Sequence, residues 1–498
     1  MLGPMSFRFL NETRQVGDGR WGNDAPSQLW RYNLHYFDDL NSFDSASRDG
    51  WHVEAIAGWI RDNPPAGGDA WAPYPTSLRV VNWIKRALNG AVLDDPVIHS
   101  LAMQVRVLSQ RLEYHLLGNH LFANAKALVF AGLFFDGSEA ERWLAKGMNI
   151  LVGEFPEQIL ADGGQFERSP MYHALALEDV LDLINVGHAM SRAFPDYWMG
   201  FADTWPGVAQ RMRTWLRVMC HPDGEISLFN DAAIGIAPSP AELERYANEL
   251  LDASEVSGSG LDASDAVRVV QLSDSGYIRA DTSDAALFLD VAPVGPDYLP
   301  GHAHADTLSF ELSLFGQRVI VNGGTSQYGL GPERDAERGT PAHSTVTVDE
   351  QDSSEVWAGF RVARRARPFD LALEHQAEHL LVACSHDGYR RLPGRPVHRR
   401  TWILEPRTLH VEDRIDGRFQ TAIARFHLHP GVECTIDTAT SSGSFRLPNG
   451  HTAAWRATGG RVHAERSLYR PEFGRRIPTQ CLVLKFDGVA AASMEINW

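Results

Sequence analysis

Two short stretches in the first half of the sequence hold residue types that bind and move protons. The run Gly118–Leu128 opens with Asn119 and His120, an amide and an imidazole, ahead of apolar residues at helical spacing. An asparagine in this position is equally typical of a helix N-cap. The second stretch, Gly163–His173, has a glycine pair and a proline around polar and aromatic residues, with Tyr172 near its end. Loops of this kind commonly carry function; the alternative is a surface ion pair beside a core tyrosine.

Two stretches in the second half add histidines. His302, His304 and Asp306 lie close together, and in an extended segment their side chains would point to one face. Two imidazoles and a carboxylate suit either metal binding or proton transfer. His343 follows in the run Thr340–Thr345, and because the chain has 20 histidines, a single one here is more often structural.

Two kinds of structure must hold these clusters. From about residue 32 to 253, apolar residues recur at helical spacing, as in Val80–Leu88 and Leu175–Ile184. The Gly/Ser-rich stretch 254–265 follows, and after it the period shifts to two. We therefore predict a helical domain over residues 1–260 and an antiparallel β domain over residues 266–498 that contributes histidines to the site.

A hairpin is predicted directly after the histidine pair. Apolar residues alternate over 308–314, a turn follows at Gly316–Gln317, and an apolar run returns over 319–321. An ideal hairpin with this turn pairs Asn322 with Glu311. His304 would then lie seven residues, roughly 23 Å, further along the strand. The side chains of His304 and Asn322 can therefore meet only if the segment that carries His304 folds back. Further strands are expected at 345–349, 380–383, 401–404, 424–428 and 482–486.

Length, charge and composition exclude several classes of protein. At 498 residues the chain exceeds the roughly 250–300 residues that one core serves, so at least two packed units are expected. A net charge of -17 argues against nucleic acid as a partner. The four cysteines are scattered, which argues against a zinc ribbon or a disulfide scaffold. No run of about 18 apolar residues and no signal-type start is visible. We therefore expect no membrane partner and a cytoplasmic location, or a periplasmic or secreted one if a leader was removed.

The clusters resemble the heparinase II/III family of polysaccharide lyases. The resemblance rests on the order and spacing of several runs: Trp30–Asp38, Gly118–Leu128, Phe166–His173, His302–Asp306, Val321–Thr325 and Ala342–Thr345. These runs span most of the region from about residue 30 to 365. The resemblance implies an N-terminal α/α toroid (an incomplete barrel) followed by a C-terminal antiparallel β-sandwich, with an acidic polysaccharide in the cleft between them.

The resemblance also implies β-elimination on a uronic acid. The C5 proton of such a sugar is weakly acidic because the adjacent carboxylate already carries negative charge, so hydrogen-bond donors must stabilise the intermediate. Asn119 matches the family's carboxylate-binding asparagine, and we assign His302 to the same role. Tyr172 matches the catalytic tyrosine, which donates a proton to the leaving O4 and can also remove the C5 proton. His120 is the alternative base for the opposite epimer.

A divalent metal is implied at His304, Asn322 and His343, where metal-binding members of the family have His, Asp and His. The Asn322 amide stands in place of the carboxylate and supplies no charge, so zinc should bind less well and manganese or calcium should compete better. We expect a structural metal, zinc before manganese, that braces the site, and no organic cofactor.

Several side chains in or near the matched runs are candidate contacts for the polysaccharide: Arg79, Asn82, Gln165, Glu167, Arg338, Trp357 and Arg361. The planar guanidinium of arginine suits carboxylate or sulfate. The basic run Arg361–Arg367 offers local positive charge, which an acidic protein needs to bind an acidic polymer. The alternative for that run is a solvated strand face.

The sequence therefore predicts a lyase for glycosaminoglycans such as heparin, heparan sulfate, hyaluronan or chondroitin sulfate. Alginate or another polyuronide is the alternative substrate for the same fold. A glycoside hydrolase is an alternative from another class and needs two carboxylates about 5–10 Å apart, for which Glu167 with Asp231 or Asp306 is the available pairing. A polysaccharide-binding protein without catalysis is the third alternative. The sequence leaves the oligomeric state open.

Overall fold

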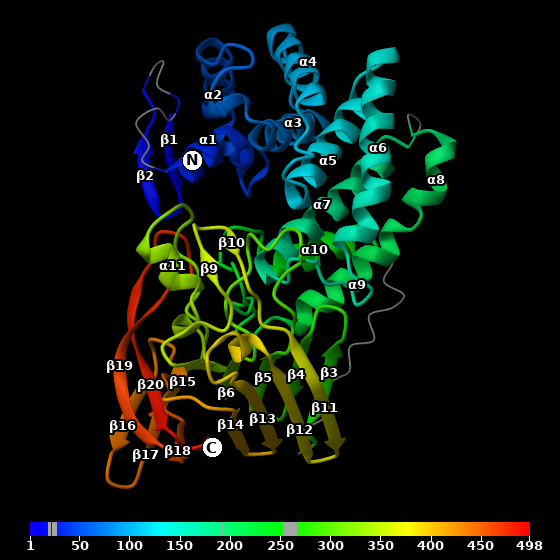
Figure 1. The fold of residues 1–498 in the computed structure, drawn as a ribbon. Coiled ribbons are helices and arrows are strands. Elements are labelled where there is room, and N and C mark those ends of the chain that lie inside the picture. Colours follow the sequence, from blue (N-terminus) through cyan, green and yellow to red (C-terminus); the bar gives the residue numbers. More distant parts are fainter. Residues whose placement is uncertain (18–20, 22–26, 192–193, 252–265) are drawn as a thin grey trace. The chain divides into compact units, whose positions relative to one another are not determined.

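The computed structural model describes residues 1–17, 21, 27–191, 194–251 and 266–498 (Figure 1). They form two compact units that are not consecutive along the chain. The first unit holds Met1–Gln158 and Glu178–Ala209, and the second holds Ile159–Leu177 and Gln210–Trp498. The domain boundary predicted over residues 254–265 lies outside the described residues. The second unit therefore includes two segments that precede that boundary.

The first unit is helical, as the apolar spacing predicts. Its elements are β1 Ser6–Phe9, β2 Glu12–Gln15, α1 Gln28–Tyr36, α2 Asp49–Asp62, α3 Pro73–Leu88, α4 Asp95–Gln110, α5 Gly118–Phe134, α6 Ser138–Gln158, most of α7 Pro170–Ala189, α8 Asp196–Ala202 and the start of α9 Trp205–Val218. Strands β1 and β2 form a short antiparallel hairpin. In the described part of the chain, no helix is both long enough and apolar enough to span a bilayer.

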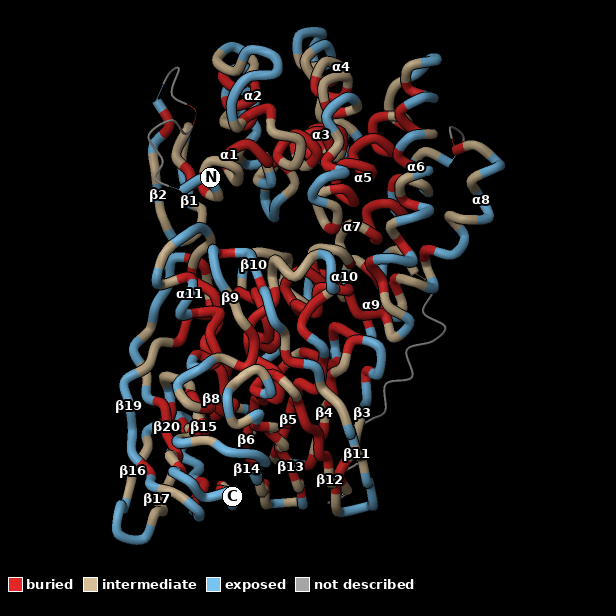
Figure 2. Tube along the Cα trace, in the orientation of Figure 1, coloured by how far each residue is buried: buried red, intermediate tan, exposed pale blue. Residues whose placement is uncertain are grey.

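Helix α5 is buried along most of its length, as expected for a helix that is apolar on every side (Figure 2). It packs against α6 and α3. A Cβ on Gly132 of α5 would lie 2.6 Å from the backbone nitrogen of Leu144, and one on Gly147 of α6 would lie 2.7 Å from the carbonyl oxygen of Ala125. The two helices can approach this closely because both positions lack a side chain.

The second unit consists mainly of antiparallel sheets, with strands in the orders β3-β4-β5-β6-β7, β11-β12-β13-β14-β21-β18-β17-β16, β19-β20-β15-β8 and β10-β9. The strand bounds are β3 Arg268–Leu272, β4 Tyr277–Asp281, β5 Ala285–Asp290, β6 Phe310–Leu314, β7 Gln317–Ile320, β8 Val346–Val348, β9 Val356–Trp357, β10 Arg361–Val362, β11 Pro368–Gln376, β12 His379–His386, β13 Val397–Glu405, β14 Thr408–Asp416, β15 Thr421–His427, β16 Glu433–Asp437, β17 Ser442–Arg446, β18 Thr452–Thr458, β19 Arg461–Tyr469, β20 Ile477–Asp487 and β21 Ala491–Asn497. The unit also holds α10 Pro240–Leu250 and α11 Pro332–Arg338. The strands predicted from the period-two runs are confirmed.

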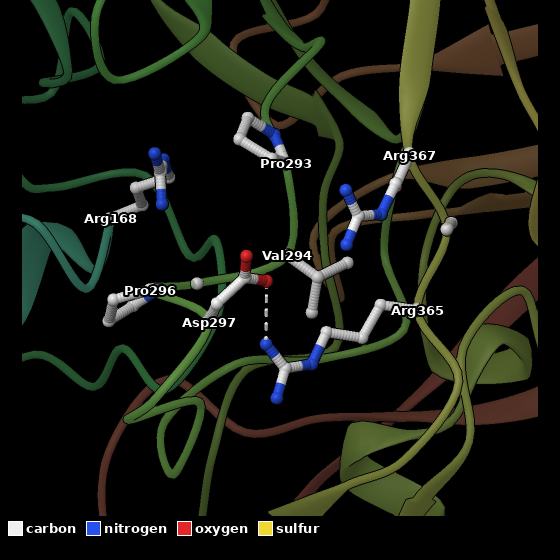
Figure 3. Close-up of a pocket in the computed structure, with 9 residues that line it drawn as sticks. Arg168, Pro293, Val294, Pro296, Asp297, Arg365 and Arg367 are labelled. Atoms are coloured by element: carbon white, nitrogen blue, oxygen red, sulfur yellow. Dashed lines mark hydrogen bonds and ion pairs between the residues drawn. The ribbon is translucent and has the colours of Figure 1, made fainter.

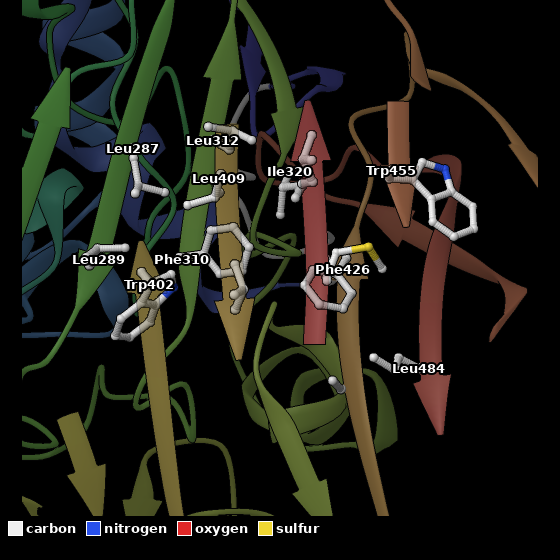
Figure 4. Close-up of a cluster of buried hydrophobic side chains, with 14 of the residues drawn as sticks. Leu287, Leu289, Phe310, Leu312, Ile320, Trp402, Leu409, Phe426, Trp455 and Leu484 are labelled. Carbon is white, nitrogen blue, oxygen red and sulfur yellow. The ribbon is translucent and has the colours of Figure 1, made fainter. Parts of the chain in front are cut away.

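One apolar core joins the three larger sheets of the second unit. It includes Leu287 from β5, Phe310 from β6, Trp402 from β13, Phe426 from β15 and Trp455 from β18 (Figure 4). Buried and less buried residues alternate along β13 and β14, so each of these strands turns one face to the core. Burial of one large apolar side chain contributes about 1.5–3 kcal/mol, so this core holds the sheets together.

The hairpin predicted after the histidine pair is formed by β6 and β7, but its turn lies one residue earlier than predicted. Leu314 pairs with Gln317, so Phe315 and Gly316 are the turn residues, with φ of 51° and 75°. A tight two-residue turn of this type needs positive φ at both positions. The register also shifts after Leu312, so the ideal pairing assumed from the sequence is wrong.

Candidate functional site

Tyr172 lies in the first turn of α7, in the segment that belongs to the second unit. Pro170 begins this helix, where a proline fits because the N–H group of that position has no partner within the helix. The Tyr172 side chain is buried. Its hydroxyl hydrogen-bonds the Tyr328 hydroxyl over 2.9 Å, and its ring packs against His302 with the ring centroids 4.1 Å apart. The fold thus brings together Tyr172 and His302, two of the predicted catalytic residues.

Asp231 connects the two histidines of the His302–Asp306 cluster. His302 Nδ1 lies 2.9 Å from Asp231 Oδ2, and His304 Nε2 lies 2.8 Å from Asp231 Oδ1. Arg334 from α11 donates to both oxygens of this carboxylate, over 2.6 Å to Oδ2, and Arg334, Asp231 and His304 are all fully buried. His302 and His304 therefore point to the same partner. The segment that carries them is not a strand, and Asp306 bonds the Asn230 backbone instead, so the single face predicted for all three residues is not observed.

The surrounding charges decide which of these groups hold protons. Burial alone would raise the pKa of Asp231, but the charge of Arg334 and the hydrogen bonds from His302 and His304 outweigh it and hold that pKa well below its usual value. Asp231 is therefore ionised at neutral pH, and the ring nitrogens that face it carry protons. Burial, followed by the neighbouring Tyr328 and Asp231, raises the pKa of Tyr172 well above 10. Tyr172 is thus protonated at neutral pH, as a general acid must be.

Glu167 approaches the other nitrogen of His302. Its Oε2 lies 3.9 Å from His302 Nε2, so the imidazole lies between the carboxylates of Asp231 and Glu167. Gln165 holds the Glu167 loop: its Nε2 donates to Glu167 Oε1 over 3.2 Å, and its Oε1 accepts the Glu167 backbone N–H over 2.9 Å. Gln165 and Glu167 are 1% and 2% exposed. Gln165, which was predicted to contact the sugar, therefore acts on the loop in this structure.

His173 anchors the same loop in a way that requires a neutral ring. The backbone N–H of Gln165 donates to His173 Nδ1 over 3.2 Å, and His173 Nε2 donates to the Met212 carbonyl over 2.9 Å. Protonation of Nδ1 would remove the acceptor of the first bond. Burial lowers the pKa of His173 to about 4, and burial lowers the pKa of His427 to about 4 as well.

The protein should therefore lose stability as the pH falls from 6.5 to 5. An unfolded histidine takes up its proton near pH 6.5, whereas folded His173 and His427 stay neutral down to about pH 4. The unfolded state then binds more protons, and each such histidine lowers the free energy of unfolding by about 1.4 kcal/mol per pH unit. Urea unfolding at several pH values measures this slope, which His173→Gln should reduce. A free energy of unfolding that is constant from pH 6.5 to 5 would contradict the prediction.

In the first unit, Asn119 and His120 lie in the first turn of α5, whose N-cap position is Leu117. The alternative that Asn119 caps the helix is therefore wrong. Asn119 forms a side-chain hydrogen bond with Tyr74, whose pKa burial raises above its usual value. The His120 ring packs on Tyr74 with centroids 4.5 Å apart, and its Nδ1 lies 3.1 Å from Glu113 Oε1. With Nδ1–H donated to the carboxylate, Nε2 keeps the lone pair that a general base needs.

The predicted metal ligands lie in one cluster but do not surround one point. His304 Nδ1 and His343 Nε2 face each other at 3.3 Å, whereas Asn322 Oδ1 lies 3.3 Å from His343 Nδ1, the opposite nitrogen of that ring. One imidazole cannot turn both nitrogens to the same ion, so in this arrangement Asn322 orients His343. The ranges that the structure describes contain no group of three or more His, Cys, Asp or Glu side chains placed to hold a metal. Asparagine is not among those residue types, so the set of His304, Asn322 and His343 and metal binding itself stay predictions.

Arg79 and Asn82, two predicted sugar contacts in the first unit, are buried and form hydrogen bonds within that unit. Arg79 is fully buried, donates from Nε to Gln104 Oε1 over 2.8 Å, and places its guanidinium 3.9 Å from the centre of a Trp59 ring. Asn82, also buried, donates to the Tyr36 carbonyl over 3.0 Å. Their polar atoms are bonded within the helical packing in this structure, and the contacts with a sugar stay predictions.

Of the three remaining predicted sugar contacts, all in the second unit, one is buried and two are exposed. Arg338 is fully buried and donates to the Ala303 carbonyl over 2.9 Å, so it holds the histidine segment in this structure, and its contact with a sugar stays a prediction. Trp357 and Arg361 pair directly across the β9–β10 ladder, and both are exposed. Their predicted contact with a sugar remains open to test.

Three residues of these clusters were not found from the sequence: Glu113, Tyr328 and Arg334. Tyr328 lies just beyond the matched run Val321–Thr325, and Arg334 lies in the short helix that follows. Neither belongs to a recognisable motif, because each reaches its partner, Tyr172 or Asp231, only through the fold.

Comparison with known proteins accounts for nearly the whole chain. The family model described as heparinase II/III N-terminus matches residues 28–250, and the one described as heparinase II/III-like, C-terminal matches residues 266–498. A heparin-sulfate lyase from Bacteroides stercoris is 26% identical over 255 residues, which are 48% of this chain and 37% of that protein. The FtsZ-localized protein C of Caulobacter vibrioides is 25% identical over 460 residues, 85% of this chain and 74% of that protein. The chain thus spans little more than a third of the length of the Bacteroides protein.

A solved structure of heparinase III superposes with a TM-score of 0.72 at 17% identity, covering 97% of this chain and 78% of that one. At this identity the likeness shows the fold. The predicted fold class, an N-terminal α/α toroid followed by a C-terminal antiparallel β-sandwich, is therefore confirmed. Two matching family models, which together reach from residue 28 to residue 498, show that the chain belongs to the heparinase II/III family.

Proposed function

We propose that this chain is a polysaccharide lyase that cleaves a uronic-acid-containing polymer by β-elimination, with heparin or heparan sulfate as the first substrate class. The observation that carries the proposal is the contact between Tyr172 and His302. Tyr172 is a buried phenol that keeps its proton at neutral pH, and its ring packs on the imidazole of His302, which is hydrogen-bonded to Asp231. Relatives named heparin-sulfate lyase support the activity and this choice of polymer. Hyaluronan, chondroitin sulfate and alginate are further substrates of the same chemistry.

The reaction breaks the C5–H and C4–O4 bonds and forms a C4=C5 double bond, so the leaving O4 must gain a proton. Tyr172 is protonated at neutral pH and supplies that proton. Where His120 is the base, it takes the C5 proton first and later releases it to solvent, from which the Tyr172 phenolate regains a proton. Where Tyr172 is itself the base, its phenol first loses its proton to solvent, and the phenolate then takes the C5 proton and passes it to O4. The hydroxyl of Tyr328 lies 2.9 Å away and, in addition to burial, raises the pKa of Tyr172, so it helps to keep this acid protonated.

Asn119 and His302 are assigned to the uronate carboxylate. His302 Nδ1 is bonded to Asp231, so Nε2 is the nitrogen left to meet the sugar. His120 is assigned as base for the epimer that presents its C5 proton from the opposite face, because its Nδ1 contact with Glu113 leaves Nε2 as acceptor.

Incubation of the purified chain with heparin, heparan sulfate, hyaluronan, chondroitin sulfate and alginate tests the proposal. We expect an absorbance rise from the unsaturated uronate on at least one polymer. His120→Ala should reduce that rise on polymers of one epimer and spare those of the other, because only one orientation of the C5 proton needs this base. New reducing ends without an absorbance rise would indicate hydrolysis and exclude the lyase.

The hydrolase alternative suits these residues less well. A glycosidase needs one carboxylic acid and one available carboxylate beside the scissile bond. Both oxygens of Asp231 are engaged by Arg334 and the histidines. Burial raises the pKa of Asp306 to about 6, but this side chain accepts the Asn230 backbone N–H and is 3% exposed, out of reach of a sugar.

A second candidate function is association with FtsZ without catalysis. It is favoured by one observation: the relative named FtsZ-localized protein C matches 85% of this chain, whereas the Bacteroides heparin-sulfate lyase matches 48%. Co-sedimentation with FtsZ polymers, together with no absorbance change on any polymer, would favour this function over the lyase.

A further inference from the structure

A pocket of about 280 Å³ in the second unit is lined by three arginines and one carboxylate (Figure 3). Arg168 precedes α7, Asp297 lies in the segment that follows β5, and Arg365 and Arg367 lie just before β11. Asp290 and Asp162, outside the lining, offset part of the Arg168 charge. Among the lining residues themselves, three guanidinium groups and one carboxylate leave a surplus of positive charge. The chain as a whole has a net charge of -17, so this local positive charge favours binding of an anionic ligand at the pocket.

Arg168 is fixed before any ligand arrives. Its Nε donates to the Ser275 carbonyl over 2.9 Å and its Nη1 donates to the Phe166 carbonyl over 3.2 Å. Its backbone has a φ of 60°, which a residue with a side chain rarely adopts, and the Tyr277 hydroxyl bonds its carbonyl over 2.7 Å. A guanidinium held in this way loses little freedom when it binds an anion.

Arg365 and Arg367 supply further donors. Arg365 Nη1 bonds Asp297 Oδ1 over 3.0 Å, and its buried Nε has no hydrogen-bond partner among the described residues. Arg367 is exposed, and its backbone N–H is bonded to Asp387 Oδ1 over 2.8 Å. Guanidinium groups bind tetrahedral oxyanions through paired N–H donors, so the pocket suits a sulfate or phosphate ester better than a neutral sugar.

The pocket shares its walls with the segments that carry the Tyr172–His302 pair. Val294 of the lining packs in one cluster with Ala303, the residue after His302, and Arg168 lies four positions before Tyr172. We propose that this pocket takes a sulfate ester of the polymer and so makes the chain prefer sulfated over unsulfated polysaccharide. This inference rests on the proposed lyase function and names the substrate class of that site.

Calorimetric titration of the full chain tests the pocket, with Tyr172→Phe present in every arm to prevent turnover. The ligands are a heparin oligosaccharide and the same oligosaccharide after desulfation. Arg367→Gln should weaken binding of the sulfated ligand about 10-fold, as loss of one charge-assisted contact implies, and leave the desulfated ligand within about twofold. Asp297→Asn should strengthen binding of the sulfated ligand severalfold, because it removes the carboxylate that competes for Arg365.

The matched control is Arg364→Gln, which removes the same charge from a highly exposed side chain that pairs with Glu355 outside the pocket. It should change neither affinity by more than about twofold. Equal losses for Arg364→Gln and Arg367→Gln, or no loss for Arg367→Gln, would overturn the pocket. So would inorganic phosphate that binds more tightly than the sulfated oligosaccharide. If heparin binding depends on Arg367 but the wild type cleaves no polymer, the lyase proposal fails and the pocket stands.

Discussion

Replacing Tyr172 with phenylalanine should reduce turnover by at least about 10²–10⁴-fold on every polymer that the wild type cleaves. The substitution removes only the hydroxyl, so the ring contact with His302 remains while the proton donor for O4 is lost. Initial rates from the absorbance of the unsaturated product measure the effect. The unfolding transition of the variant should stay close to that of the wild type, because one hydrogen bond between hydroxyls is lost.

Tyr328→Phe is the matched variant for this prediction, since it removes the other hydroxyl of the same 2.9 Å hydrogen bond. It keeps the acid and removes the hydroxyl that orients it and raises its pKa, so we expect a rate loss of about 10-fold and a shift of the alkaline limb of the pH–rate profile to lower pH. If Tyr172→Phe cleaves any polymer at the wild-type rate, the mechanism proposed here is wrong.

Replacing Asp231 with asparagine should cost about 3–5 kcal/mol of folding free energy. The substitution leaves the buried guanidinium of Arg334 without its counter-charge, and loss of one partner of a buried pair is far more costly than loss of the pair. The same change releases His302 and His304, so activity should fall with stability. Chemical unfolding at pH 7 measures the loss.

Two comparisons distinguish this prediction from a general effect of lost charge. Asp297→Asn breaks an exposed ion pair with Arg365 and should cost less than about 0.5 kcal/mol. The double variant Asp231→Asn/Arg334→Met should regain part of the stability, because no unpaired charge stays buried. The stabilisation from Asp231 is present above the unfolded carboxyl pKa near 4 and is lost as the pH falls toward its much lower folded pKa. Near-wild-type stability of Asp231→Asn at pH 7 would refute the assignment.

Local patterns predicted the elements of the fold well, because burial imposes its period on the sequence. The helix over Val80–Leu88 and the strands after residue 265 lie where the periods of 3.6 and 2 put them. The hairpin turn was misplaced by one residue because Phe315 adopts a positive φ, which its side chain does not indicate. The His304 segment does fold back, through a positive φ of 63° at Leu308 and a hydrogen bond from Ser309 N to Asp306 O.

The candidate site was only partly predictable, because residue type reports chemistry but not burial. Tyr172 and His302 were found and do meet, whereas Arg79 and Arg338 were chosen as arginines near matched runs and prove to be enclosed. Asp231 was noticed only as a possible hydrolase carboxylate. Its contact with Arg334 joins residues more than a hundred positions apart, and no local pattern records such a contact.

The segment Ile159–Leu177 has a consequence for how the protein is made. A ribosome synthesises these residues well before the strands of the second unit, yet the Ser169 hydroxyl bonds the Asp231 carbonyl and the Tyr277 hydroxyl bonds the Arg168 carbonyl. The nascent segment must therefore wait for its partners, which lie 62 and 109 positions further along the chain. A C-terminal fragment that begins after residue 265 would lack Arg168, whose carbonyl the Tyr277 hydroxyl bonds in the full chain.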